Sequence, residues 1–375
     1  MPVNSLEDIP MVFFSVDSKA RTPGDRAADG PRREHDRTPH RRRDSGLFRR
    51  GRLGVALVAV SALALSGCFS DGGSGAPADA SLGEPLKVTQ IGFPNEITLV
   101  WALKKGLFAK HGIAVEPVTL ASASSAVAAA DSGQVDLAFS GGWGAIVAAS
   151  QGVKVKIVMG AYFNPTPPDP TRSRGVFAST KSGAKAYCDL VGKTVGVTEL
   201  NGPGQVYTSA AVRKAGCDDK KIKYVNIPSA QMATSLKGGA VDAINASGAI
   251  GQTLVREGGA VWLGEPYADV QGRINYADYV ASEKFVAGNA DRIAKFRAAM
   301  DESLRQIKDP ANEAEWQQMA ADFGKTTVEA IRASQFEELS SEVDRAALQK
   351  MADLAHEFGA ISTRVDTSGL VHESA

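Results

Sequence analysis

Apolar residues follow two spacings along most of this chain of 375 residues. Short runs rich in Val, Ile and Phe predict strands, and they alternate with stretches in which apolar residues recur every three or four positions, as on one face of a helix. After a first strand over residues 86–91, the residues Ile97, Val100, Leu103 and Leu107 form such a face. Alternation of this kind is typical of a sheet with helices packed on its faces. The order continues with predicted strands over 113–118, 135–139 and 153–157, and with helices that begin near Ser124 and Gly144.

The sequence contains the same supersecondary unit of strands and helices twice. A Gly-x-Val-Asp segment begins at Gly133 and again at Gly239, 106 residues later. Chance recurrence in a chain rich in Gly and Val is the alternative, but further landmarks keep nearly the same spacing. The repeat therefore predicts two α/β lobes, each with a mostly parallel sheet, and a cleft between them. The further pairs are the strand residues Val88 and Val195, 107 apart, and the helix-ending glycines Gly112 and Gly216, 104 apart.

The pattern also predicts where the chain passes from one lobe to the other. Short strands over 175–179 and 278–282 are interpreted as the two crossings and as the hinge. After residue 289 the pattern is helical, with one apolar stripe through Ile293, Phe296 and Met300. These helices are expected to pack on the first lobe, with a surface for a bundle-type partner as the alternative. The predicted boundaries are 85–177 for lobe one, 178–279 for lobe two, and 280–375 for the return to lobe one with the C-terminal helices.

The N-terminal part of the chain predicts export. Arginines precede an apolar run over residues 53–65 that is too short to span a membrane, and small residues then lead to Cys68. Leu65-Ser66-Gly67-Cys68 resembles a bacterial lipobox, so we expect residues 47–67 to be a lipoprotein signal peptide and Cys68 to be lipidated; an ordinary signal peptide is the alternative. Residues 1–46 have a disordered composition or precede the true start, and 68–84 are expected to be a flexible tether. The protein is thus expected on the outer face of a cell membrane, exported by the Sec or the Tat route.

The charge balance argues against a nucleic-acid partner, and the positions of two cysteines predict a disulfide. Without residues 1–67 the chain has 30 basic and 34 acidic residues, which gives no reason to expect nucleic acid as a partner. Cys188 precedes the strand near Val195, and Cys217 follows the helix after it. Because the helix of a right-handed strand-helix unit runs back toward the start of its strand, the two sulfurs should lie at the same end of the lobe. Outside the cytoplasm this arrangement favours a disulfide.

Three segments resemble a known family. Trp101–Ile113, Gly133–Ala138 and Asp189–Val197 are similar to segments of the nitrate, sulfonate, taurine and thiamine-pyrimidine group of ABC-transporter substrate-binding proteins. The resemblance covers about residues 86–310. It implies the bilobal periplasmic-binding-protein fold of type II, and a receptor that closes on a small solute and delivers it to a membrane permease with its ATPase. It implies no cofactor, and it does not identify the solute.

Ligands of open α/β sheets bind at the carboxyl ends of strands, where loops lead into helix N-termini. Backbone N–H groups there attract anions, and glycines allow a close approach. Trp143 and Tyr162 could enclose a planar or methylene-bearing solute, and Glu96 or Glu199 could accept an amine or a ring N–H, although ordinary tight connections and a solvated Glu are the alternatives. The predicted ligand-binding residues are Asn95, Glu96, Ser140, Gly141, Gly142, Trp143, Tyr162, Glu199, Asn201, Gly202, Asn245 and Ser247.

Enzymatic function finds little support in the sequence. Three histidines follow residue 68, none of them in a zinc motif, and Gly192-Lys193-Thr194 imitates a P-loop without its first Gly. We therefore predict no catalytic residue, no metal and no cofactor. Two alternatives stay open. One is an enzyme of this fold, as in pyrimidine or menaquinone pathways, and the other is a lipoprotein that senses a ligand without transporting it.

Overall fold

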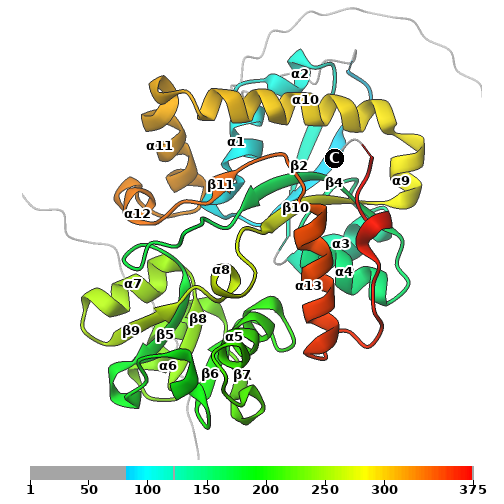
Figure 1. Cartoon of the computed structure of the whole chain (residues 1–375). Coiled ribbons are helices and arrows are strands. Elements are labelled where there is room, and N and C mark those ends of the chain that lie inside the picture. The colour runs from blue at the N-terminus through cyan, green and yellow to red at the C-terminus, as the bar shows by residue number, and fades with distance from the viewer. Residues whose placement is uncertain (1–81, 121–122, 374–375) are drawn as a thin grey trace, which may run out of the picture. The chain divides into compact units, whose positions relative to one another are not determined.

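The computed structural model describes residues 82–120 and 123–373 (Figure 1). The predicted signal peptide, the lipidation site at Cys68 and most of the tether lie outside the described residues. The described part of the chain forms two α/β lobes, each built around its own sheet.

The first lobe contains a four-stranded sheet in the order β11, β4, β10, β3, together with the parallel pair β1 and β2. A bridge between Val88 and Leu137 joins β1 to the segment that leads into β3. The strands of this lobe are β1 (Leu86–Gln90), β2 (Val115–Thr119), β3 (Ala138–Phe139), β4 (Val155–Phe163), β10 (Asn275–Ser282) and β11 (Glu338–Leu339).

Helices from both ends of the described chain cover the first lobe. The predicted packing of the C-terminal helices on this lobe agrees with the structure, in which α10 lies against α1 (Figure 1). Phe296 and Met300 of α10 are fully buried in the same core as Trp101 of α1. Phe296 also stacks on Phe108, with ring centroids 5.6 Å apart. The helices are α1 (Ile97–Lys104), α2 (Leu107–Lys110), α3 (Ala123–Asp131), α4 (Gly142–Ser150), α9 (Glu283–Gly288), α10 (Ala290–Ile307), α11 (Glu313–Phe323), α12 (Val328–Ala333) and α13 (Arg345–Glu357).

The second lobe contains a five-stranded sheet in the order β7, β6, β8, β5, β9. Its core has two halves, one around Val195 and Val212 and the other around Phe177 and Ile244. Its elements are β5 (Gly175–Ser179), β6 (Thr194–Val197), α5 (Pro203–Lys214), β7 (Lys223–Asn226), α6 (Met232–Lys237), β8 (Ala243–Ala246), α7 (Gly248–Arg256), β9 (Ala260–Gly264) and α8 (Pro266–Val270).

The sheets are mixed, which corrects the prediction of mostly parallel sheets. The pairs β1–β2, β6–β7 and β6–β8 are parallel, as the strand-helix-strand pattern predicted. The strands β5 and β10, however, pair antiparallel with their neighbours. Each of them brings the chain into a sheet from the other lobe, so its direction is not set by a right-handed crossover from the preceding strand.

The crossings also differ from the prediction. Residues 175–179 and 278–282 are not free hinge strands, because they lie inside the two sheets as β5 and as part of β10. The segments between the sheets are residues 164–174 and 265–274, of which the second includes α8. The predicted lobe boundaries thus fall within β5 and β10, and the residues that flex on closure stay a prediction. Two strands also differ in length: β3 is only Ala138–Phe139, whereas β4 extends to Phe163.

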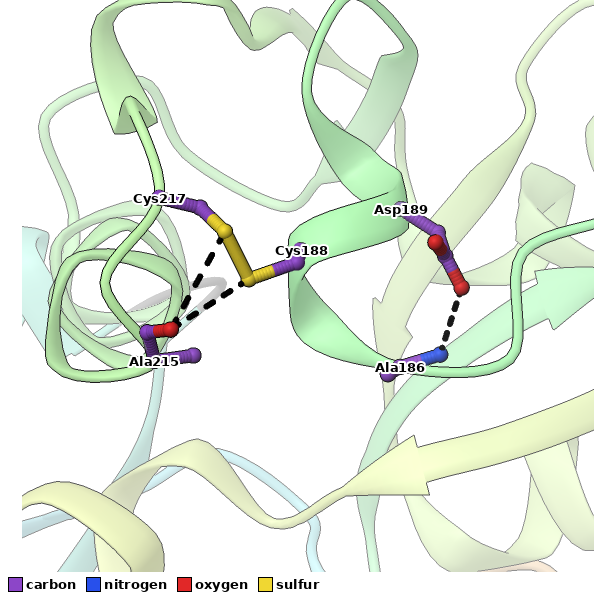
Figure 2. Close-up of a disulfide and its surroundings, with 5 residues drawn as sticks. All are labelled: Ala186, Cys188, Asp189, Ala215 and Cys217. Atoms are coloured by element: carbon purple, nitrogen blue, oxygen red, sulfur yellow. Dashed lines mark hydrogen bonds between the residues drawn. A yellow bond between two sulfur atoms is a disulfide. The ribbon is translucent and has the colours of Figure 1, made fainter.

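Cys188 and Cys217 form a disulfide in the second lobe, as strand and helix direction predicted (Figure 2). Cys188 lies in a short 3-10 turn before β6, and Cys217 lies just after α5. Figure 2 shows the bond beside the carbonyl of Ala215, whose oxygen is 3.5 Å from the Cys188 sulfur. In the same turn, Asp189 accepts the backbone N–H groups of Lys185 and Ala186. The bond thereby ties the segment that enters β6 to the end of α5.

Candidate functional site

A cleft with two chambers lies between the lobes. One chamber, of about 530 Å³, opens toward α7 and α12 and is called the polar chamber below. The other, of about 520 Å³, lies between α3, α4 and β10 and is called the apolar chamber. The two are contiguous, because they share six lining residues from both lobes: Phe93, Tyr162, Glu199, Pro203, Tyr267 and Tyr276.

The polar chamber is built at the carboxyl ends of strands, as expected for an open α/β sheet. From the second lobe, Asn245 and Ala246 end β8, and Ser247 caps α7. Asn245 donates to the Gly204 carbonyl over 3.2 Å, which joins the end of β8 to the first turn of α5. The first lobe contributes Asn95 from the loop after β1. Both lobes therefore place polar groups on one enclosed space.

Arg174 is the central cation of the polar chamber. It comes from the first crossing segment, and its guanidinium lies 4.0 Å from the ring centroid of Tyr276 and 5.5 Å from that of Tyr267. Such stacking on aromatic faces holds a guanidinium in place while leaving its edge free to donate. The buried Nε of Arg174 has no hydrogen-bond partner among the described residues. It is a donor available to a bound molecule.

Two carboxylates surround this cation. Burial raises the pKa of Glu337, while Arg174 and a hydrogen bond from Asn95 act in the opposite direction. Burial likewise raises the pKa of Glu265 to about 7 against the opposing effect of Arg174. Glu265 Oε2 accepts the N–H of Ala268, and within the described residues Oε1 has no partner. Of the two, Glu337 lines the chamber and offers an acceptor beside Arg174, whereas Glu265 is fully buried and does not line it.

The apolar chamber has a different lining. Trp143 and Val147 lie one turn apart on the same face of α4, and Val127 of α3 and Met351 of α13 complete the wall. Gly141 allows α4 to begin against β10, since a Cβ there would come within 2.7 Å of the Tyr276 carbonyl oxygen. This close approach positions the exposed face of α4 over the chamber.

The structure brings eight of the twelve predicted ligand-binding residues to the cleft. Asn95, Asn245 and Ser247 line the polar chamber, and Ser140, Gly141 and Trp143 line the apolar one. Tyr162 and Glu199 line both.

The other four predicted residues do not line the cleft. Glu96 is only 1% exposed, and its carboxylate accepts the backbone N–H groups of Ile91, Gly92 and Phe93 over 2.8 to 3.1 Å. It therefore shapes the loop that carries Asn95, and it is neither solvated nor free for a ligand. The remaining three are Gly142, which faces Leu348 and Asp278; Asn201, an exposed residue with φ 57°; and Gly202, which caps α5 beside Glu199.

Sequence reasoning missed Arg174, Tyr267, Tyr276 and Glu337. The first three lie on or beside the segments that cross between the lobes, and Glu337 directly precedes β11. A usable signal existed for the first three, since any segment that connects two lobes has to border the cleft between them. Nothing local marked Glu337, which is separated by more than 150 residues from Arg174.

The described residues contain no group of three or more His, Cys, Asp or Glu side chains placed to hold a metal ion. In the same part of the chain, no helix combines the length and the apolar character needed to cross a bilayer.

The chain matches one known protein family. The family model described as NMT1/THI5 like matches residues 93–314. No curated protein sequence matches the chain significantly.

Solved structures match most of the chain. The periplasmic aliphatic sulphonate binding protein SsuA from Escherichia coli is 19% identical, with a TM-score of 0.64 over 76% of this chain and 97% of that one. The alkanesulfonate-binding protein SsuA from Xanthomonas axonopodis pv. citri, bound to MOPS, is 16% identical, with a TM-score of 0.62 over 77% and 98%. The nitrate-binding protein NrtA from Synechocystis PCC 6803 is 16% identical, with a TM-score of 0.59 over 76% and 83%. The chain therefore belongs to the NMT1/THI5-like family and has the α/β, bilobal fold of periplasmic binding proteins.

Proposed function

We propose that this protein is the extracytoplasmic solute-binding component of an ABC importer. The observation that carries the proposal is the cleft, in which Asn95 of the first lobe and Asn245 of the second lobe line one chamber of about 530 Å³ together with Arg174. A solute that contacts both lobes stabilises the closed form over the open one, which is the requirement for ligand-driven closure. Family membership and the printed functions of the similar structures support the same class.

The polar groups of the polar chamber indicate which functional groups the solute carries. Arg174 Nε can donate to a sulfonate, a carboxylate or a ring nitrogen. Asn95 Oδ1, which is also buried and has no partner within residues 82–120 and 123–373, and the Glu337 carboxylate can accept from an amine or a ring N–H. A solute with both kinds of group, taurine-like or aminopyrimidine-like, satisfies more of these atoms than nitrate does. Unsatisfied buried polar atoms cost about 1–3 kcal/mol each, so the difference is large enough to decide specificity.

The proposal includes the route of delivery. Lipidation at Cys68 would hold the protein on the outer face of the membrane, where it would pass the solute to a permease driven by an ATPase. The lipobox-like segment Leu65–Cys68 and the Gly- and Ser-rich residues that follow it support this part.

The test begins with a melting screen of the mature protein against sulfonates, taurine, nitrate, thiamine precursors and flavins. Calorimetric titration of the solute found should then show that Arg174→Gln weakens binding about 10- to 100-fold, because a hydrogen bond to a charged group is lost. Arg256→Gln is the matched control, since Arg256 is exposed on α7 and does not line either chamber. Scattering should show a smaller radius of gyration with the solute.

Three results would contradict the proposal. The first is a screen without any stabilising solute, and the second is full affinity of Arg174→Gln. The third is turnover of the bound molecule, which would favour an enzyme. Unchanged uptake of the solute by cells that lack the protein would contradict the transport role alone.

A further inference from the structure

The apolar chamber is larger than a small polar solute requires. It adds about 520 Å³ to the polar chamber, and the two share the wall formed by Tyr162, Tyr267 and Tyr276. The ring centroids of Tyr162 and Tyr276 lie 6.1 Å apart, and those of Tyr267 and Tyr276 lie 5.2 Å apart. The two chambers therefore meet at these rings, so a molecule held at Arg174 lies next to the second chamber.

The lining shows which chemistry the second chamber accepts. Its deep walls are Val127, Phe139, Trp143, Val147 and Met351, whereas its carboxylates, Asp131 and Glu199, belong to an exposed helix end and an exposed loop. Neither arginine of the polar chamber lines it. The uncharged polar residues of the lining are Ser140, Gln151 and Asn275, and the Asn275 amide is already paired with the backbone of Glu342 and Asp344. Water against the apolar walls makes few hydrogen bonds, so an apolar group that replaces it there is favoured.

We infer that the apolar chamber is a second subsite of the cleft, which binds an alkyl or aryl part of the same solute whose polar head lies in the polar chamber, an anionic head at Arg174 or a cationic head at Glu337. The inference rests on the proposed solute-binding function and adds that the natural solute is amphipathic and several carbons long. Half-buried Trp143 and Val147 form its floor on one face of α4.

Two homologous probe series test this subsite: n-alkanesulfonates and n-alkylammonium ions, each from methyl to octyl. Affinity in at least one series should rise about three- to fourfold per methylene group, until the chamber is filled, because each buried methylene adds a fixed transfer free energy. Trp143 fluorescence should change with the longer members and not with the methyl compound.

Matched variants assign the effect to the chamber. Val147→Gln places an amide in the apolar wall and should remove the dependence on chain length while retaining the affinity of the methyl compound. Val255→Gln is the control, because Val255 is also half-buried near the end of a helix but lines neither chamber. Ala128→Phe is a second test at an exposed position on the rim, where folding is not at risk, and it should lower the affinity of the octyl compound alone.

The outcomes separate this inference from the proposed function. Affinity that is independent of chain length, or an unchanged slope in Val147→Gln, overturns the apolar subsite. Failure of both series to bind, while the melting screen yields a solute, also overturns it and leaves solute binding intact. Among these measurements of chain length, none counts against the proposed function itself, whereas a melting screen without any ligand does.

Discussion

Asp278 should make the protein less stable as pH rises from about 4 to about 7. This residue of β10 is 0% exposed, and neither carboxyl oxygen has a hydrogen bond of good geometry among the described residues. Burial raises its pKa from 3.8 to about 7, although the nearby backbone N–H of Gly142 acts to lower it. Because a buried carboxylate without partners is costly, the folded protein favours the neutral acid.

The sign and the size of the effect follow from linkage. Between about pH 4 and pH 7 the folded state binds a proton that the unfolded state has lost, so wild-type stability falls as pH rises across this window and is constant above it. A shift of about three pKa units corresponds to about 4 kcal/mol, which is an upper bound because the lobe can relax. Asp278→Asn has a similar shape and cannot ionise, so it should lack the part of this pH dependence that Asp278 contributes. Glu265, whose pKa burial also raises to about 7, contributes equally to both proteins.

The assay is thermal and urea unfolding of both proteins between about pH 4 and pH 8.5. The two should be similar near pH 4, whereas above pH 7 the variant should melt several degrees higher, since 1 kcal/mol corresponds to about 2–4 °C in a domain of about 200 residues. Asp353→Asn on the exposed face of α13 is the control and should follow the wild-type curve. A wild type without a stability loss between about pH 4 and 7, or a variant that is less stable at pH 8, would refute the reasoning.

Three further changes have defined expectations. Cys188→Ser should lower the free energy of unfolding by roughly 3 kcal/mol, because the disulfide closes a loop of 29 residues in the unfolded chain. Unfolding in urea measures this loss. Two free thiols in the oxidised, denatured wild type would contradict the prediction. Glu96→Ala should cost about 1–3 kcal/mol, since three backbone N–H groups lose their acceptor; an unchanged urea midpoint would show that water replaces the carboxylate. Cys68→Ala should release the folded protein from the membrane fraction, and unchanged detergent partitioning would rule out the lipid anchor.

Asn201→Ala should leave the affinity for the solute unchanged, although the sequence predicted Asn201 to be a ligand-binding residue. The exposed side chain lies outside both chambers, so the variant should retain full affinity for the solute. Calorimetric titration of Asn201→Ala and Arg174→Gln with the same solute measures the affinity of both variants. A loss of affinity of more than about fivefold in Asn201→Ala would place the ligand closer to the N-terminus of α5 than the chambers indicate.

The apolar pattern by itself determined the two lobes, the buried faces of the helices and the pairing of Cys188 with Cys217. These features depend on periodicity and on the handedness of strand-helix units, both of which are local properties of the chain. The stripe through Ile293 and Phe296 predicted a buried face on the first lobe for the same reason, and both residues are buried there.

Tertiary structure decided which polar residues face the cleft. Glu96 looked like a ligand residue because it follows a strand, yet three N–H groups of its own loop hold its carboxylate. The sequence could place Arg174 only on a segment that crosses between the lobes, because its role depends on Tyr267 and Tyr276, about 100 residues away. A loop side chain turns toward the groups that satisfy its hydrogen bonds and charge. For Glu96 these groups lie in its own loop, whereas for Arg174 they come from distant segments that meet only when the chain has folded.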